Sequence, residues 1–257
     1  MTPMTRARSN RATAVASTPS AQLPGIRFAT FLGTLAAEIR ATRSGEKSRL
    51  RLFAAASRLL ESVGYRDLQV ENISAEAHLA KGSFYVHFDS KEQFLHELLR
   101  RYVEFESQTY PAPTASETSF GGVKRVVGWY AQTFESNVGL LRCMLQMSAV
   151  DEVVHTIWQR RNQAVVERAV SDFMRTTGRR IRDESLVRLA VRTAGGMLDQ
   201  SLFTRYGLQA SPGAELQTIE YDVLVELLAL LLYRAVYASD PPPAEVSKVK
   251  PLLTQRD

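Results

Sequence analysis

The residues whose types and spacing could do chemistry are concentrated in one short segment, residues 77–92. Positions 81–83 are lysine, glycine and serine, and they stand where the pattern predicts that a helix begins. The free N–H groups and the dipole at a helix start favour phosphate, and a glycine there lets the backbone approach closely. Tyr85 and His87 add hydrogen-bond donors. These residue types indicate noncovalent recognition of a DNA groove.

Three short helices are expected to hold this segment in one pose. Apolar side chains recur at helical spacing in two stretches before it, and a tight turn follows the second stretch. This order of elements is typical of a helix-turn-helix unit. Ser90 and Gln93 then have the spacing of a capping box, which opens a longer helix. The expected helices cover residues 46–63, 70–77, 81–87 and about 91–109.

Positive charge is concentrated at the front of the chain. The 257 residues carry a net charge of +5. Residues 1–60 contain ten Lys/Arg and two Glu, a net of +8, so the remainder carries −3. A basic front on a nearly neutral body indicates a polyanion as the partner of the front end. We expect residues 1–22 to form a disordered basic arm and residues 23–45 an extra N-terminal helix.

Composition argues against several other classes of protein. One cysteine and four scattered histidines supply neither a disulfide nor the ligands of a zinc site, so we expect no metal and no cofactor. No stretch reaches the roughly 20 apolar residues of a membrane span, which predicts a cytoplasmic protein with no membrane partner. The chain has no phosphate loop, nucleophile elbow or general-base pair, so we do not expect an enzyme.

The rest of the chain predicts an all-α fold. Between residues 93 and 238 every periodic segment is helical, and the alternation typical of strands does not occur. Glycines and the pair Ser211-Pro212 separate the segments. Residues 239–257 contain a run of prolines at 241–243 and are expected to form a disordered tail. The expected helices of this part cover residues 121–136, 138–148, 151–176, 184–206 and 214–238.

About residues 46–95 resemble the DNA-binding domain of the TetR family of bacterial transcriptional regulators. The resemblance is carried by the order of four runs in this sequence. These runs are LLESVGY at 59–65, VENIS at 70–74, KGSFYVHF at 81–88 and SKE at 90–92. It implies a homodimeric, all-helical repressor whose third helix reads the major groove of DNA. It also implies a helix-turn-helix domain over residues 46–92 and a ligand-binding and dimerisation domain over residues 93–238.

The same resemblance implies which residues contact DNA. Three positions depart from the family's common pattern. Gln69 replaces a capping Thr or Ser, His78 replaces the turn glycine, and Ala80 replaces a capping Ser. His78 therefore has to adopt a left-handed conformation, which is unfavourable for a residue other than glycine. The alternative interpretation is that the lysines are solvated and that Tyr85 belongs to the core. The expected DNA contacts are Gln69, Lys81, Gly82, Ser83, Tyr85, His87 and Lys91.

Two of the expected C-terminal helices carry the features of a dimer interface. Apolar side chains surround much of the helix at 214–238, so it has to be covered on more than one side. Small residues in the helix at 184–206 permit a close helix crossing. The alternative is a core helix of a monomer. The expected interface residues are Gly195, Gly196, Leu224, Leu228 and Leu231.

Large aromatic and methionine side chains lie between the DNA-binding unit and the expected interface. Such side chains suit an adaptable apolar cavity, where Asp199 and a few other polar groups would orient a ligand. The alternative is ordinary core packing. We expect a small, largely apolar ligand, and the expected ligand-binding residues are Trp129, Phe134, Met144, Met147, His155 and Trp158.

These expectations combine into one leading function and two alternatives. The leading one is a sequence-specific transcriptional regulator, a repressor that binds double-stranded DNA at a palindromic operator and is released by its ligand. A helical protein-binding adaptor and a helical enzyme are the alternatives. Retention on duplex DNA that weakens steeply with salt would favour the regulator.

Overall fold

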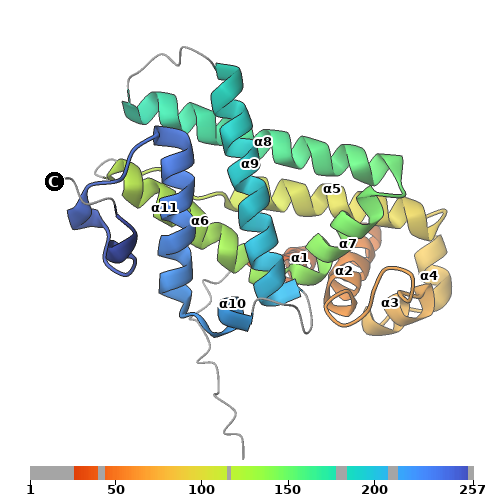
Figure 1. The fold of residues 1–257 in the computed structure, drawn as a ribbon. Helices are drawn as coiled ribbons and strands as arrows, with labels where there is room; N and C mark the ends of the chain where they lie inside the picture. Colours follow the sequence, from red (N-terminus) through yellow and green to blue (C-terminus); the bar gives the residue numbers. More distant parts are fainter. Residues whose placement is uncertain (1–25, 40–43, 115–116, 178–183, 208–213, 254–257) are drawn as a thin grey trace, which may run out of the picture.

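The computed structural model describes residues 26–39, 44–114, 117–177, 184–207 and 214–253. Over these residues all regular secondary structure is helical, as the sequence pattern predicts (Figure 1). None of the described helices has both the length and the apolarity that crossing a membrane requires. The expected basic arm at residues 1–22 lies outside the described residues.

The first part of the molecule, which we call the head, consists of four helices. They are α1 (Phe28–Glu38), α2 (Ser44–Leu59), α3 (Val70–Glu76) and α4 (Lys81–Tyr85). An aromatic cluster fixes α4, because the ring of Phe94 lies 5.2 Å from Phe53, 5.1 Å from Phe84 and 4.9 Å from Phe88. The burial of these rings leaves the opposite side of α4 uncovered.

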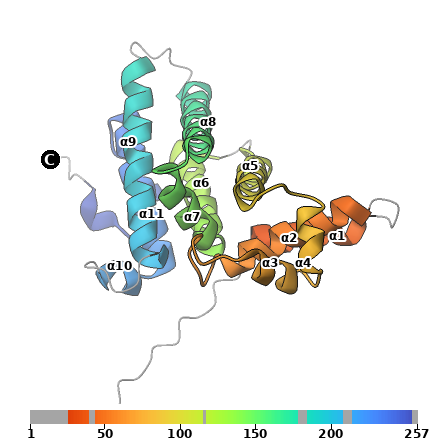
Figure 2. The same cartoon turned by 90° about the vertical axis from the view of Figure 1, so that its right-hand side faces the viewer.

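Helix α5 (Lys91–Thr109) connects the head with the rest of the molecule (Figures 1 and 2). Its start has the predicted capping residues: the Ser90 hydroxyl accepts a hydrogen bond from the backbone N–H of Gln93 at 3.1 Å. The Gln93 side chain in turn accepts from the backbone N–H of Asp89 at 2.7 Å. Two reciprocal bonds thus determine where α5 begins.

The body comprises α5, the later helices and the C-terminal tail. Its helices after α5 are α6 (Ser119–Ser136), α7 (Val138–Ser148), α8 (Glu152–Thr177), α9 (Glu184–Leu202), α10 (Ala214–Thr218) and α11 (Tyr221–Tyr237). In Figure 2, α9 and α11 form one outer layer at the left, α6 and α8 lie between this layer and α5, and the head lies at the lower right.

The structure corrects the expected single helix at residues 214–238, which is broken between α10 and α11. The Arg205 guanidinium donates to the backbone oxygens of Leu216 at 2.5 Å and Ile219 at 2.8 Å. These are carbonyls that a continuous helix would use for its own hydrogen bonds. The expected helix at 184–206 also differs, since α9 ends at Leu202 and a π-helical turn covers Phe203–Gly207.

The tail is ordered over residues 239–253, so the prediction of disorder is wrong there. It forms two 3-10 turns, Pro243–Glu245 and Lys250–Leu252, and buries Val246 and Val249. The reason is Glu226 of α11, whose carboxylate is 1 % exposed and accepts from the backbone N–H groups of Ser247, Lys248 and Val249. Residues 254–257 lie outside the described part.

Helix α1 fastens the head to the body. The backbone N–H of Phe28 donates to Oδ1 of Asn137 at 2.8 Å, and Nδ2 of Asn137 donates to the backbone oxygen of Ile26 at 2.9 Å. Beside this contact, a Cβ atom at Gly139 would lie 2.3 Å from the backbone oxygen of Leu60. Gly139 thus permits α7 to touch the end of α2.

Candidate functional site

One exposed face of the head belongs to α4 and the residue after it. Phe84 is fully buried, whereas Tyr85 is 54 % exposed. Lys81 and Gly82 are exposed, and Ser83 and His87 are partly exposed. We call the surface formed by residues 81–83, 85 and 86 the α4 outer face. Five of the seven expected DNA contacts therefore lie on or beside one surface that no described part of the chain covers.

The sequence interpretation missed Val86, which is 78 % exposed on this face. Its backbone N–H donates to the oxygen of Gly82 at 3.3 Å, so the helical turn continues through it. The signal was available, because a helix that buries Phe84 has to expose a residue two positions later. Because valine is apolar, the sequence interpretation did not count Val86 among the exposed residues.

Lys81 forms an ion pair with Glu71 of α3, and both side chains are more than half exposed. An exposed pair of this kind contributes little to stability, because water screens it and two long side chains lose freedom. Lys81 is thus held close to the start of α3, and breaking its pair with Glu71 costs little free energy. Gln69, at the start of α3, is exposed and makes no capping bond with its side chain.

Lys91 has partners inside the head that the sequence did not predict. Its ammonium donates to the backbone oxygens of Tyr65 at 3.0 Å and Leu68 at 2.8 Å, and it lies 4.4 Å from the centre of the Tyr65 ring. Two of its three N–H bonds are therefore used inside the head. Lys91 fixes the loop that leads into α3, and this is a positioning role.

The turn between α3 and α4 has the strain that the sequence predicts. His78 has a φ of 53°, in the left-handed region, so this prediction is confirmed. Ala80 precedes α4 without a side-chain capping bond. The aromatic cluster beneath α4 therefore has to hold a helix start that its own sequence supports poorly.

None of the expected ligand-binding residues lines the cavity described below, which the body forms near Tyr110. Phe134 and Met144 were expected to line a cavity, but both side chains are fully buried in the core. His155 is exposed and lies 3.3 Å from the backbone oxygen of Ser148. Trp158 packs against the Arg161 guanidinium, at 5.2 Å. Met147 packs, half-buried, against the same core. Ordinary core packing is the better interpretation for Phe134, Met144, Met147 and Trp158, and His155 is a surface residue.

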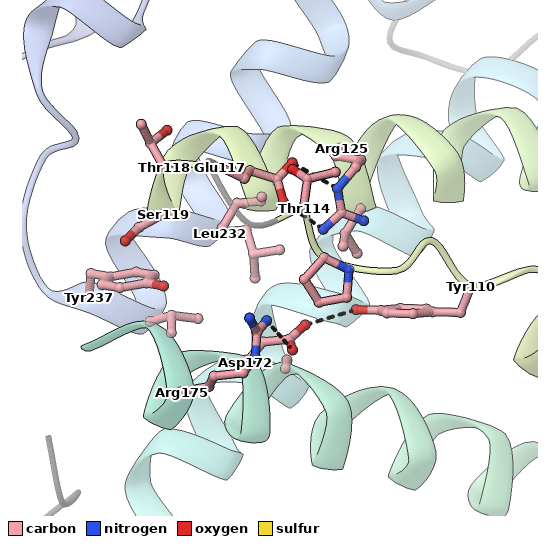
Figure 3. A pocket seen from close by; sticks show the side chains of 16 residues that line it. Tyr110, Thr114, Glu117, Thr118, Ser119, Arg125, Asp172, Arg175, Leu232 and Tyr237 are labelled. Carbon is pink, nitrogen blue, oxygen red and sulfur yellow. Dashed lines mark hydrogen bonds and ion pairs between the residues drawn. The ribbon is translucent and has the colours of Figure 1, made fainter. Parts of the chain in front are cut away.

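The body has a cavity elsewhere, at the end farthest along α5 from the head (Figure 3). It encloses roughly 100 Å³ between the loop after α5, the start of α6 and the ends of α8 and α11. Its polar wall consists of paired charges: Arg125 binds Glu117 at 2.8 Å, and Arg175 binds Asp172 at 2.9 Å. Its apolar side includes Leu232 and Val236. Tyr110, the residue directly after α5, lines it too.

A buried polar network occupies the centre of the body. Arg161 of α8 donates to both carboxylate oxygens of Glu106 of α5, at 2.5 and 2.8 Å, and to the Tyr130 hydroxyl of α6 at 3.2 Å. The Tyr130 hydroxyl donates to Asp199 of α9. Burial raises the pKa of the Asp199 carboxyl, although the nearby Arg161 opposes the shift. The network thus joins four helices through one guanidinium.

Trp129 stands between this network and the cavity. Its ring meets Tyr110 edge-on at 5.3 Å and lies 6.3 Å from the Tyr130 ring. Its buried indole Nε1 has no hydrogen-bond partner among the described residues. It is the one expected ligand residue that adjoins the observed cavity, although it does not line it.

The expected dimer residues differ in how far they are buried. Leu224 and Leu228 are buried inside their own body, so the prediction that they face a partner is wrong. Leu231 is half-buried. Gly195 and Gly196 of α9 have open space where a side chain would begin. The same helix exposes Leu186 by 62 % and Leu189 by 58 %, which the sequence interpretation had not singled out.

Within the described residues, no three His, Cys, Asp or Glu side chains are grouped so that they could hold a metal ion. The chemistry available at the α4 outer face is hydrogen bonding, charge attraction and apolar contact. This is the chemistry of recognition of a surface.

Comparison with known proteins identifies the helix-turn-helix unit. Residues 52–98 match the model of the bacterial regulatory proteins of the tetR family. The chain is 32 % identical over 98 residues to the HTH-type transcriptional repressor DhaR of Mycobacterium sp. (strain GP1). That match covers 36 % of this chain and 48 % of DhaR, so it spans about half the length of the relative.

The similarity of fold extends further along the chain. A tetR-family transcriptional regulator from Streptomyces coelicolor superposes with a TM-score of 0.58 at 16 % identity, over 77 % of this chain and 90 % of that one. FadR from Bacillus subtilis, crystallised with stearoyl-CoA, gives 0.51 at 16 % identity, over 71 % and 96 %. Residues 52–98 of this chain are therefore similar to the DNA-binding domain of the TetR family of bacterial regulators, and the chain shares the fold of the TetR-family regulators.

Proposed function

We propose that this protein is a sequence-specific DNA-binding transcriptional regulator, a repressor rather than an enzyme, that acts on DNA in the cytoplasm. The observation that carries the proposal is the α4 outer face, where exposed donors stand on a helix that an aromatic cluster fixes from behind. A helix presented in this way fits the major groove of B-DNA. The repressor activity is proposed by analogy with DhaR.

The contacts divide by chemistry. Lys81 and Gln69 suit phosphate, because both are exposed beside the start of α3 or α4. Ser83, Tyr85 and His87 can form hydrogen bonds with base edges, and Gly82 permits close approach. Lys91 acts indirectly by fixing the loop at Tyr65 and Leu68.

The test is selection of bound duplexes from a random pool, followed by affinity measurements at several salt concentrations. We expect a palindromic sequence to be enriched, and Lys81→Ala to reduce the slope of log affinity against log salt by about 1 for each half-site. Lys250→Ala, which removes an exposed lysine of the C-terminal tail, is the matched control and should leave the slope unchanged. If no sequence is enriched and Lys81→Ala has no effect, the proposal fails.

We propose a homodimer formed by the outer surfaces of α9 and α11. Leu186, Leu189 and Gly196 fall on one side of α9, and the Gly196 position leaves room for a second helix. Val223, Leu227 and Leu231 form a half-buried strip on α11. A symmetric dimer would place two α4 helices against half-sites about 34–36 Å apart, or a multiple of this distance.

Sedimentation of the Leu189→Glu variant tests the dimer. We expect monomers and loss of operator binding. Val150→Glu, on an exposed valine of the turn between α7 and α8, should remain dimeric. A Leu189→Glu protein that stays dimeric would place the interface elsewhere. A dimer that binds no duplex would favour the protein-binding adaptor.

We propose that a small, largely apolar ligand in the cavity beside Tyr110 releases the operator. FadR of Bacillus subtilis binds stearoyl-CoA, but a cavity of roughly 100 Å³ suits a smaller molecule. Tyr110 lies at one end of α5, and the head holds the other end. A ligand that moves the Tyr110 end can therefore tilt α5 and alter the spacing of the two heads.

The experiment measures operator affinity with small aromatic and short acyl compounds, for the wild type and for Val236→Trp, which fills the cavity. We expect one class of compound to weaken wild-type binding and to leave Val236→Trp unaffected. Equal release of both proteins would exclude this cavity.

A further inference from the structure

We infer that Val86 determines sequence specificity by contacting the 5-methyl group of a thymine in each half-site. This inference rests on the proposed function, since it concerns how the α4 outer face reads DNA. It adds an apolar contact to a surface on which the sequence indicated only polar ones.

The position of Val86 on α4 carries the inference. Successive residues of an α-helix are about 100° apart around its axis, so Gly82 and Val86 both lie within about 20° of the point opposite Phe84. Phe84 is fully buried against Phe88 and Phe94, and this fixes the direction of the opposite side. Val86 has φ −69° and ψ −24°, so it continues the helix.

Gly82 has no side chain and has open space around it. Of the two residues on the outermost ridge, Val86 is therefore the one that projects. A helix entering the major groove with this ridge forward would bring the two methyl groups of Val86 deepest. Tyr85 and Ser83 would stand on the two flanks and reach base edges or phosphates beside it.

The chemistry of the groove identifies the partner. Val86 can neither donate nor accept a hydrogen bond through its side chain, so it gains nothing from the polar atoms of guanine, cytosine or adenine. Thymine alone presents a methyl group in the major groove. A valine that is 78 % exposed in the free protein would become buried by that contact.

The experiment uses the full chain and the duplex selected from a random pool. Each thymine of the half-sites is replaced in turn by deoxyuridine, which removes only the methyl group. We expect one thymine in each half-site whose replacement weakens wild-type binding about fourfold, the effect of burying one methyl group. In Val86→Ala the same replacement should change affinity by less than about twofold, because the partner methyl groups are gone.

Val150→Ala is the matched control, since Val150 is 72 % exposed but lies at the turn between α7 and α8. It should retain the fourfold effect. If duplexes are selected but no uracil replacement matters, or the effect survives in Val86→Ala, the inference is overturned and the proposed function stands. If no duplex is selected at all, the proposed function fails and the inference fails with it.

Discussion

The head and the body differ in where their charged groups lie: at the surface in the head, and partly in the core in the body. The head has an aromatic core that Phe94 of α5 completes, and its charged side chains lie at the surface. Lys91 of α5 donates to two backbone oxygens of the head. The body buries an ion pair between Glu106 and Arg161 at its centre. A hydrocarbon core tolerates small shifts of its helices, whereas a buried ion pair is favourable only while its partners stay aligned. The stability of the body is therefore expected to depend on the alignment of one buried charge pair, and that of the head on the packing of its rings.

The largest effect on the free energy of unfolding is expected at the buried ion pair of the body. Arg161→Met leaves the Glu106 carboxylate buried without its counter-ion, which should lower the free energy of unfolding by about 3–5 kcal/mol. Chemical denaturation followed by circular dichroism measures it. Arg58→Met, which breaks the exposed pair with Glu76 in the head, should lower it by about 1 kcal/mol or less. Similar losses in the two variants would show that burial does not distinguish head from body.

Neighbouring residues of α4 sharpen the comparison within the head. Phe84→Ala removes a buried ring and should lower the free energy of unfolding by about 3–5 kcal/mol. Tyr85→Ala should change it by less than about 0.5 kcal/mol, because Tyr85 is exposed. Its operator affinity should nevertheless fall, by about 1–3 kcal/mol for each half-site. A Tyr85→Ala variant that is destabilised would show that Tyr85 supports the fold. A variant that keeps full affinity would show that Tyr85 does not contact the operator.

The C-terminal tail depends on one carboxylate of the body. Burial alone would raise the pKa of Glu226, but the Lys124 ammonium and three backbone N–H groups outweigh it and lower the pKa to about 2. A lowered pKa means that the charged form stabilises the fold above the ordinary value of 4.5 and that this contribution is lost as the pH falls toward 2.

Hydrogen exchange at the amides of residues 247–249 measures this dependence. We expect protection that is constant above pH 4.5 and declines below it. Glu226→Gln should lose about 1–3 kcal/mol of this protection near neutral pH. Glu220→Gln, on an exposed residue directly before α11, is the control. Protection that does not depend on pH in the wild type would show that the tail is held by Val246 and Val249 instead.

The smallest effect concerns one strained residue in each region. His78 in the head and Ala238 at the end of α11 have φ values of 53° and 51°. Glycine adopts this conformation without strain, so His78→Gly and Ala238→Gly should each raise the free energy of unfolding by about 1 kcal/mol or less. Ala75→Gly, in the right-handed helix α3, should lower it by about 1 kcal/mol. Destabilisation by His78→Gly would mean that its side chain has a role in the turn.

Local patterns in the sequence predict the elements but not their partners. The helices of the head, the cap at Ser90 and the left-handed His78 follow from residues close together in the chain. The break before α11 does not, because it needs Arg205 from another element. The ordered tail likewise needs Glu226, a residue about 20 positions earlier. An apolar helix such as α11 gives no sign of which leucines face inward until its neighbours are placed.

The sequence by itself determined that the chain is helical, that a short helix rich in donors stands at the front, and that the TetR family is the one it resembles. Only the tertiary structure decided that Lys91 supports a loop, that Val86 projects from α4, and that the cavity lies beside Tyr110 rather than Phe134. The physical reason is the range of the interactions. Hydrogen bonds within a helix and its caps join residues a few positions apart, whereas burial depends on which surfaces meet after folding.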